Sequence, residues 1–422
     1  MRNLLVQILK LLAKMTLARY RPRVVAITGS VGKTSAKEAI ACVMAPAFSI
    51  RASKDNHNNE IGVPLTIIGF ESGNNNALAW AWILIKALAK LVYAQYPQVL
   101  VLELGADRPG DIAYLASLIG QIDVAVLTDI GISHLEFFAN PQELAREKLS
   151  LIKKLETSSA AILNFDNLKI YESRTQTKAE IIGYGFSAEA LIQASDFHLI
   201  KSYDQWGSNF KIHYKGTVVP FFLPEALGKP SVYSALAACA VGLKFNINLV
   251  QASEALKKYL PPAGRLRVFP GIKRTLIIDD TYNAAPDSTI AALEALSQLA
   301  SGRKVAVLGG MAELGNKTES GHREVAARVV ENKIDVVFLV GEHAKIIQDE
   351  LQKRKFLGLT NWFANADLAR LPVQDALQES DTILVKGSQS ARMEKIVKEI
   401  LAEPEWVGEL LVRQNEKWLA NP

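Results

Sequence analysis

Short continuous runs of apolar residues, each followed by a stretch with helical periodicity, recur along the whole chain. The runs occupy residues 24–27, 99–103, 124–128, 161–164, 276–279, 304–309, 336–341 and 382–387. A strand that is buried on both faces of a parallel sheet has a continuous apolar run rather than an alternating one. Strands that alternate with helices form parallel sheets through right-handed crossovers. The pattern therefore predicts an α/β protein with mainly parallel sheets.

Two changes in this pattern divide the chain. Residues 187–223 alternate between polar and apolar positions and carry few helix signals, which predicts a small antiparallel excursion. Residues 231–258 return to helical periodicity, and Pro261-Pro262-Ala263-Gly264 then marks a linker. We therefore predict a central domain over residues 23–262 and a C-terminal α/β domain over residues 263–422.

Two broad apolar stripes with lysines beside them stand apart from this alternation. The first covers residues 1–22, where Lys10 and Lys14 lie one turn apart, and the second covers residues 77–96. Charges interrupt the first stripe, so it matches neither a secretory signal nor a spanning helix of about 20 uncharged residues. We predict two amphipathic helices, and two arrangements stay open. The helices pack on the protein and pair to cover its sheet, or they dock together on an anionic membrane.

The composition is that of a folded globular protein, with 49% hydrophobic and 22% charged residues in a chain of 422. The net charge is +5, and the first 37 residues contain no Asp or Glu. The remainder is close to neutral, so no nucleic-acid-binding surface is expected. Cys42 and Cys239 are far apart in the sequence, which argues against a disulfide framework and fits a reducing compartment. We expect a cytoplasmic monomer, either free or at the inner face of the membrane.

A glycine-containing segment follows the first apolar run and precedes a helical stretch at residues 33–44. Its residues are Thr28, Gly29, Ser30, Val31, Gly32, Lys33, Thr34 and Ser35. In such a strand–loop–helix unit, backbone N–H groups and the helix N-terminus surround phosphate oxygens. Lys33 supplies positive charge for the β and γ phosphates, and the Thr34 hydroxyl suits Mg²⁺. The segment predicts a nucleoside triphosphate site.

Two further residues are candidate metal ligands. Glu103 ends the second apolar run, and His134 follows the run that ends at Thr128. Because the carboxyl ends of parallel strands meet at one edge of a sheet, both side chains are expected beside the phosphate loop. Each alone is more often structural, but with Thr34 they supply oxygen and nitrogen ligands for a divalent cation.

Several segments resemble the Mur ligase family, and within it the branch that adds D-alanyl-D-alanine. The matching segments are residues 56–66, 103–105, 128–136, 148, 264–266, 280–288, 308–315 and 386–388. They follow one another in order over roughly residues 24–400. The resemblance implies a P-loop-type central domain with a mainly parallel sheet and a Rossmann-like C-terminal domain.

The resemblance also implies the chemistry and its residues. ATP would phosphorylate the carboxylate of a UDP-muramyl peptide, and the amine of D-alanyl-D-alanine would attack the resulting acyl phosphate. Lys33, His134 and Lys148 would be the catalytic residues, and Asn283 would join the loop in binding ATP. Thr34, Glu103, His134 and a carbamylated Lys148 would hold magnesium. The implied substrate-binding residues are Asn56, Asn58, Asn59, Arg265, Lys386, Gly387 and Ser388. If the family resemblance is set aside, the helical pattern around Lys148 predicts only an exposed lysine on a helix.

Two departures from the family pattern concern the substrate. The N-terminal domain that holds the uridine nucleotide in the family is expected to be missing, with the residue 1–22 helix in its place. Gln389 stands where the family pattern has an arginine. Two other functions therefore stay open: an ATP-dependent amide ligase with another acyl acceptor, and a non-catalytic nucleotide-binding scaffold. A scaffold has no chemical need to keep all four of Lys33, Glu103, His134 and Lys148.

Overall fold

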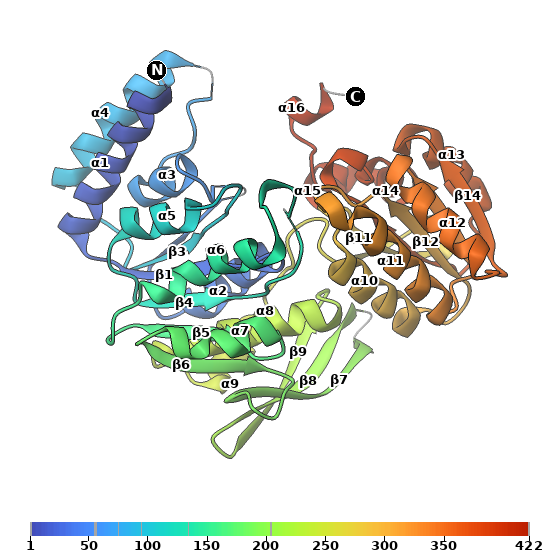
Figure 1. Ribbon diagram of the computed structural model, residues 1–422, viewed down its shortest axis with the longest axis horizontal. Coiled ribbons are helices and arrows are strands. Elements are labelled where there is room, and N and C mark those ends of the chain that lie inside the picture. Colours follow the sequence, from blue (N-terminus) through green and yellow to red (C-terminus); the bar gives the residue numbers. More distant parts are fainter. Residues whose placement is uncertain are drawn as a thin grey trace.

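Two β-sheets organise the molecule (Figure 1). The computed structural model describes residues 2–54, 57–74, 76–93, 95–133, 135–202 and 205–420. The predicted residues Asn56 and His134 lie outside these ranges. The fold class expected from the sequence, α/β with mainly parallel sheets in a central and a C-terminal part, is confirmed.

The larger sheet has, within the described ranges, nine strands in the order β2-β3-β1-β4-β5-β6-β7-β8-β9. Their bounds are β1 Arg23–Thr28, β2 Ile50–Ala52, β3 Val99–Glu103, β4 Val124–Leu127, β5 Ala160–Asn164, β6 Glu180–Gly185, β7 Ile192–Ser202, β8 Gln205–Tyr214 and β9 Thr217–Pro224. The strands from β2 to β7 pair in parallel, and β7, β8 and β9 pair antiparallel. The predicted antiparallel excursion is thus one margin of this sheet.

Helices cover both faces of the larger sheet. One face carries α2 (Lys33–Met44), α8 (Gly228–Lys244) and α9 (Leu249–Leu256), and the other carries α3 (Gly62–Ile68), α5 (Asp111–Ile119), α6 (Pro141–Lys153) and α7 (Leu168–Glu172). The two covered faces explain why the apolar run in strand β1 is continuous. Val25 and Ile27 belong to the first core, and Val24 and Ala26 belong to the second. Successive side chains of a strand point to opposite faces, so both sets are buried.

Helices α1 (Arg2–Tyr20) and α4 (Ala77–Tyr93) lie side by side on the outside of α3 and α5 (Figure 1). Leu9, Leu12 and Ala13 of α1 are buried in the second core, as are Ile83 and Ala87 of α4. The two predicted amphipathic helices therefore do pack on the protein and on each other. Within the described residues, neither these helices nor any other is long and apolar enough to cross a membrane.

The smaller sheet has, in the described part of the chain, six strands in the order β10-β11-β15-β12-β13-β14. Their bounds are β10 Arg267–Pro270, β11 Leu276–Asp280, β12 Lys304–Gly309, β13 Val336–Val340, β14 Leu359–Phe363 and β15 Thr382–Lys386. Only the β10–β11 pair is antiparallel among these described strands.

Helices also cover both faces of the smaller sheet. One face carries α10 (Pro286–Leu299), α11 (Thr318–Glu331) and α12 (Lys345–Lys353), and the other carries α13 (Ala366–Ala376), α14 (Glu394–Ile400) and α15 (Val407–Leu410). The chain passes between the two sheets through the predicted linker and reaches α16 (Glu416–Leu419) near its end. The domain limits at 262 and 263 stay a prediction.

Candidate active site

The phosphate loop joins β1 to α2 and lies where β1, β3 and β4 end. Gly29 has φ +155°, and a Cβ there would lie 2.1 Å from the Thr128 Oγ1 atom. Gly32 has φ +84° and immediately precedes the first turn of α2. Both positions therefore need glycine, one mainly for space and one for its left-handed backbone. The result is a tight loop with the N-terminus of α2 behind it, which is the arrangement that binds phosphate.

Lys33 is held over this loop. Its Nζ atom donates a hydrogen bond to the Gly29 carbonyl oxygen at 2.7 Å. Burial lowers the pKa of the Lys33 ammonium, the nearby Arg265 charge lowers it further, and the Glu103 carboxylate opposes both. A desolvated ammonium group on a phosphate loop binds a polyphosphate strongly, because the attraction between charges is stronger away from water.

Thr34 and Glu103, both predicted metal ligands, lie in direct contact. The Thr34 Oγ1 atom donates to Glu103 Oε2 at 3.1 Å, and Asn58 Nδ2 donates to the other carboxylate oxygen at 3.3 Å. Glu103 is buried at the end of β3. A hydroxyl and a carboxylate are the ligands that Mg²⁺ prefers, usually together with phosphate oxygens. Among the described residues no group of three or more His, Cys, Asp or Glu could hold a metal by itself.

Lys148 is not the surface lysine that its helix pattern suggests. It lies on α6 and is only 1% exposed. Burial lowers its pKa to about 7, and the positive charge of Lys33 contributes to the lowering. The neighbouring Glu147 carboxylate accepts hydrogen bonds from the N–H groups of Gly110 and Ile112, each at 2.7 Å. A large fraction of Lys148 is therefore a neutral amine near pH 7.

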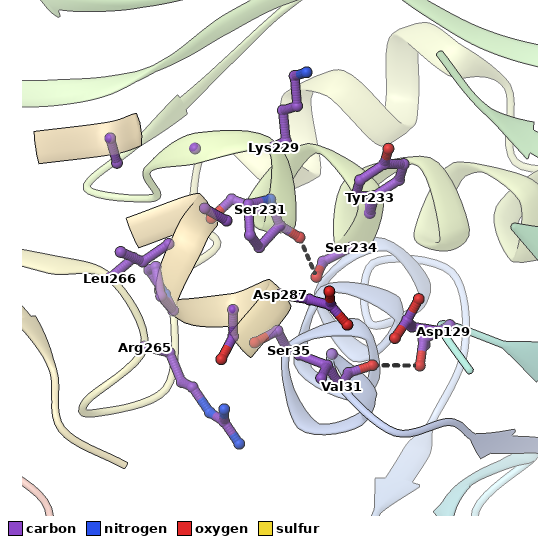
Figure 2. Close-up of a pocket in the computed structure, with 18 of the residues that line it drawn as sticks. Val31, Ser35, Asp129, Lys229, Ser231, Tyr233, Ser234, Arg265, Leu266 and Asp287 are labelled. Atoms are coloured by element: carbon purple, nitrogen blue, oxygen red, sulfur yellow. Dashed lines mark hydrogen bonds between the residues drawn. The ribbon is translucent and has the colours of Figure 1, made fainter. Parts of the chain in front are cut away.

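A cavity of about 250 Å³ opens on one side of the loop, between the two domains (Figure 2). Val31, Gly32 and Ser35 line it from the loop, and Tyr233 and Leu266 are among its other walls. Further walls come from β5, β6, α8 and α10, and Asp129 and Lys386 also border the cavity. This cavity is more apolar than polar, which suits a flat heterocycle next to a phosphate site.

Two buried polar atoms in and beside this cavity lack partners. Ser30 Oγ and Asp129 Oδ2 have no hydrogen bond within the described structure. Burial raises the pKa of Asp129 to about 6, and the Asp287 carboxylate adds to the rise. Figure 2 shows the two carboxylates turned toward one another beside Val31. Buried polar groups are rarely left unpaired, so these atoms are candidate contacts for a ligand.

A second cavity, of about 690 Å³, lies on the other side of the loop. Lys33, Thr34 and Glu103 line it together with Asn58 and Asn59. Asn58 contacts Glu103, whereas the Asn59 side-chain oxygen accepts from the N–H groups of Ile61 and Gly62 and so caps α3. The loop thus separates a small, mainly apolar cavity from a larger one whose walls are polar and apolar in equal measure.

The C-terminal residues predicted for the site fall into two groups. Asn283 and Ser388 line the larger cavity, and the Ser388 Oγ atom accepts from the Ala312 N–H at 2.7 Å. Lys386 instead borders the smaller cavity, where its Nζ atom donates to Asp280 Oδ2 and, at 3.0 Å, to the Asn283 carbonyl oxygen. Burial lowers the pKa of Lys386, against the pull of Asp280. The structure therefore places Lys386 in a buried ion pair with Asp280, next to the Asn283 backbone.

Gly387 and Arg265 complete the predicted set. A Cβ on Gly387 would lie 2.6 Å from Met393 and 3.0 Å from Gly309, so this glycine allows two strand ends to approach. Arg265 lines both cavities and lies over the Tyr282 ring, with its guanidinium carbon 4.1 Å from the ring centroid.

Several cavity-lining side chains were not among the predicted site residues: Asp107, Asp129, Ser133, Tyr282, Asp287, Glu313, Gln389 and Trp418. Asp129 could have been found, because it lies two residues past the carboxyl end of β4, at the sheet edge where Glu103 ends β3. Trp418 gives no such signal. It reaches the cavity from α16, near the end of the chain, through contacts of its ring with Arg392 and Arg413.

Two family models match the chain. The model described as Mur ligase middle domain matches residues 27–242, and the model described as Mur ligase, glutamate ligase domain matches residues 264–389. The first model ends before the predicted linker, and the second begins at the last residue of the linker, Gly264.

Individual relatives match over most of the chain. The UDP-N-acetylmuramoyl-tripeptide--D-alanyl-D-alanine ligase of Bacillus subtilis (strain 168) is 31% identical over 399 residues, which covers 94% of this chain and 79% of that protein. The enzyme of the same name from Escherichia coli (strain K12) is 31% identical over 381 residues, covering 89% and 76%.

Solved structures agree in fold. A crystal structure of MurF from Acinetobacter baumannii is 26% identical, has a TM-score of 0.78, and covers 93% of this chain and 79% of that one. The MurF ligase of Thermotoga maritima in complex with ADP has a TM-score of 0.77 over 93% of this chain and 83% of that one. At 24% identity the latter is a likeness of fold alone.

Proposed function

The chain belongs to the Mur ligase family, and we propose that it uses ATP to join D-alanyl-D-alanine to a UDP-muramyl-tripeptide. The main observation in support of this proposal is the position of the phosphate loop between two unlike cavities. Lys33, Thr34 and Glu103 face the larger cavity, and the smaller one begins at Val31 and Ser35. A nucleoside in the smaller cavity would place its phosphates along the loop and the γ-phosphate at the larger cavity.

The proposed reaction forms an amide in two transfers. A carboxylate oxygen of the peptide attacks the γ-phosphorus, the bond to the β-phosphate oxygen breaks, and ADP leaves. The neutral amine of D-alanyl-D-alanine then attacks the acyl carbon, phosphate leaves, and the amine proton is released. Lys33 and the loop N–H groups would stabilise the charge on the transferring phosphoryl group. Mg²⁺, held by Thr34 and Glu103, would supply further neutralisation of that charge.

The state of Lys148 supports this assignment. Only a neutral amine can add to CO₂, and a carbamate forms with loss of one proton to solvent. The lowered pKa of about 7 supplies that neutral amine in a buried setting. The product would place a negative charge near Lys33, where the unmodified residue would place a second positive one. We propose that Lys148 is carbamylated and that the carbamate serves as a metal ligand.

The remaining parts of the proposal concern the substrates and the setting. Asn58, Ser388 and Arg265 are proposed to contact the two substrates, because they line the larger cavity. Outside the described residues, Asn56 and His134 keep their proposed roles in substrate and metal binding. We further propose a monomeric enzyme that works in the cytoplasm.

A second candidate function differs only in the incoming amine. Gln389 lines the larger cavity beside Ser388, at the position where the family pattern has an arginine. An amide has no positive charge to offer the terminal carboxylate of D-alanyl-D-alanine. The same ATP chemistry could therefore serve a different amine at this end of the cavity.

The test is phosphate release from ATP with UDP-muramyl-tripeptide and a panel of amines. The panel contains D-alanyl-D-alanine, D-alanine, L-alanine, D-glutamate and L-lysine, and each product is identified by mass. The proposal expects tripeptide-dependent release with D-alanyl-D-alanine and a product heavier by that dipeptide. Turnover with another amine alone would select the second candidate. Absence of turnover with every amine, in a chain that binds ATP, would favour a scaffold.

A further inference from the structure

The outer faces of α1 and α4 are apolar and uncovered. The exposed side chains are Leu4, Leu11 and Met15 on α1 and Leu78, Trp82, Ile85, Leu88 and Val92 on α4. Their exposed fractions run from 42% for Met15 to 82% for Leu78. A soluble monomer normally scatters such side chains singly, and a contiguous group marks an interaction site.

Helical spacing gathers these residues into one stripe on each helix. Residues 78, 82, 85 and 92 recur at intervals of four, three and seven, and residues 4, 11 and 15 recur at intervals of seven and four. The buried residues Ile83 and Ala87 of α4 lie on the opposite side, as do Leu9 and Ala13 of α1. Each helix thus has two apolar faces. The inner face is used by the fold, and the outer face is a separate feature.

The charges around these stripes have one sign. Helices α1 and α4 contain six Lys or Arg residues and no Asp or Glu. Arg2 pairs with Glu60, Lys10 lies over the Tyr114 ring and Lys90 donates to the Gly69 carbonyl oxygen. The other three, Lys14, Arg19 and Lys86, are exposed beside the apolar stripes.

We propose that the outer faces of α1 and α4 form a docking surface for an anionic lipid bilayer. Apolar stripes flanked by cations are the pattern of helices that lie in the interface plane of a membrane. The headgroups of an anionic leaflet attract Lys14, Arg19 and Lys86. Trp82, with Lys86 4.7 Å from its ring centroid, belongs to the residue type that favours the headgroup level.

A second copy of the chain fits this surface less well. Face-to-face pairing of α1 and α4 would bring cations of both copies together, with no carboxylate on either helix to balance them. An anionic surface removes that repulsion and still covers the apolar side chains. The proposal stands on these two helices alone and does not depend on the activity proposed above.

The test is co-sedimentation of the full chain with phosphatidylcholine vesicles that do or do not contain phosphatidylglycerol. We expect binding to the anionic vesicles that weakens with added salt, and much weaker binding to the neutral ones. The variant Leu78→Gln/Trp82→Gln/Ile85→Gln should bind anionic vesicles at least about tenfold more weakly, because its apolar contribution is removed. Lys14→Glu/Lys86→Glu should lose about as much, on anionic vesicles only.

Matched variants on the C-terminal domain are the controls. Leu357→Gln/Leu368→Gln/Leu371→Gln removes three exposed leucines, and Lys353→Glu/Lys398→Glu reverses two exposed lysines. Both should bind vesicles as the unaltered chain does, and all four variants should keep its melting temperature. Equal binding by the unaltered chain and the α4 variant would overturn the proposal, as would no binding to anionic vesicles. Self-association that the α4 variant alone abolishes would also overturn it, in favour of an interface between copies.

Discussion

Buried ionisable side chains surround the phosphate loop. Lys33, Lys148 and Asp129 each have a pKa displaced by burial toward the uncharged form. Burying an ionisable group lowers the stability of the fold. Buried ionisable groups are therefore found mainly where a ligand or a chemical step uses them. The motif predicted Lys33, but no local pattern predicted that Lys148 is buried. Lys148 is buried because α6 packs against the larger sheet and because the phosphate loop that follows β1 lies close to it.

Replacing Lys148 tests the role of its neutral amine. We expect Lys148→Ala to lower ligase activity about 100-fold, because a charged group that organises a metal site is removed. Added acetate or formate should restore part of the activity by supplying a carboxylate. Lys153→Ala, an exposed position on the same helix, should leave activity unchanged. Steady-state phosphate release measures all three.

The unaltered enzyme gives an independent reading of the same residue. After CO₂ removal it should lose activity and regain it when CO₂ returns. At a fixed dissolved CO₂, recovery should be faster one pH unit above the Lys148 pKa of about 7 than one unit below, since the neutral fraction rises with pH. Full activity without CO₂, or no effect of Lys148→Ala, would rule out carbamylation.

Asp129 makes stability depend on pH. Its pKa is raised from 3.8 to about 6 in the folded chain, so the folded state holds the proton more tightly than the unfolded state. Its contribution is most favourable below the unfolded pKa and is lost as pH rises through about 6. Asp129→Asn should therefore raise the free energy of unfolding by ~2 kcal/mol above the folded pKa and by little below the unfolded one.

Urea unfolding of ligand-free protein at the two pH extremes measures this difference. The exposed carboxylate Asp375 of α13, changed to Asn, is the control, because surface substitutions usually change the free energy of unfolding by no more than about 0.5 kcal/mol. An Asp129→Asn effect that is the same at both extremes would show that the carboxylate is not a buried charge in the folded state.

At the level of elements, the apolar runs predicted the strands that are buried on both faces. All eight runs became strands, since a sheet that is covered on both faces buries every residue of such a run. Strand β14 was missed because it lies at the edge of the smaller sheet, where Leu359 and Asn361 are exposed. Strand β10 was missed because it is short and follows a proline-rich linker. The order of β2, β3, β1 and β4 in the larger sheet depends on pairing between segments that are distant in the chain, which local periodicity does not contain.

The turn between β1 and α2 gives a prediction at this scale. Gly29→Ala would place a methyl group 2.1 Å from Thr128 Oγ1 and 3.0 Å from the Asp129 backbone. We expect the free energy of unfolding to fall by ~2 kcal/mol or more and ATP-dependent activity to be lost. Denaturant unfolding and phosphate release measure the two effects.

Gly216 offers a matched comparison, because it has φ +82° with nothing within 4 Å of its added Cβ. Gly216→Ala should cost ~1 kcal/mol through backbone strain alone and leave activity intact. If both alanine variants lost the same stability and kept activity, the close approach of Gly29 to Thr128 would have no functional meaning.

At the scale of the whole molecule, the site lies between two separately folded sheets. Arg265 and Ser288 line both cavities with Val31 and Gly32, although hundreds of positions separate them in the chain. Motifs could name these residues but could not say which cavity each borders, because that depends on how the domains face each other. Lys386 shows this, since the resemblance implies a substrate contact and the structure places the residue beside the smaller cavity. Its contact with the substrate stays a prediction.

A ligand that bridges the domains should stabilise the whole chain. We expect MgATP at a hundred times its dissociation constant to add ~2.7 kcal/mol to the free energy of unfolding. Lys33→Ala should lose most of this gain at the same concentration, whereas Lys353→Ala, at an exposed position on α12, should keep it. Thermal unfolding with and without MgATP measures the gain. Equal stabilisation of both variants would place the triphosphate away from the loop.

The most direct test of the central claim follows the oxygen of the substrate carboxylate. UDP-muramyl-tripeptide labelled with ¹⁸O in its terminal carboxyl group is incubated with ATP, D-alanyl-D-alanine and the enzyme, and the released phosphate is analysed by mass. Formation of an acyl phosphate predicts one ¹⁸O atom in each phosphate, transferred from the carboxylate when the amide forms. Unlabelled phosphate would show that ATP is hydrolysed by water, and it would contradict the proposed ligase reaction.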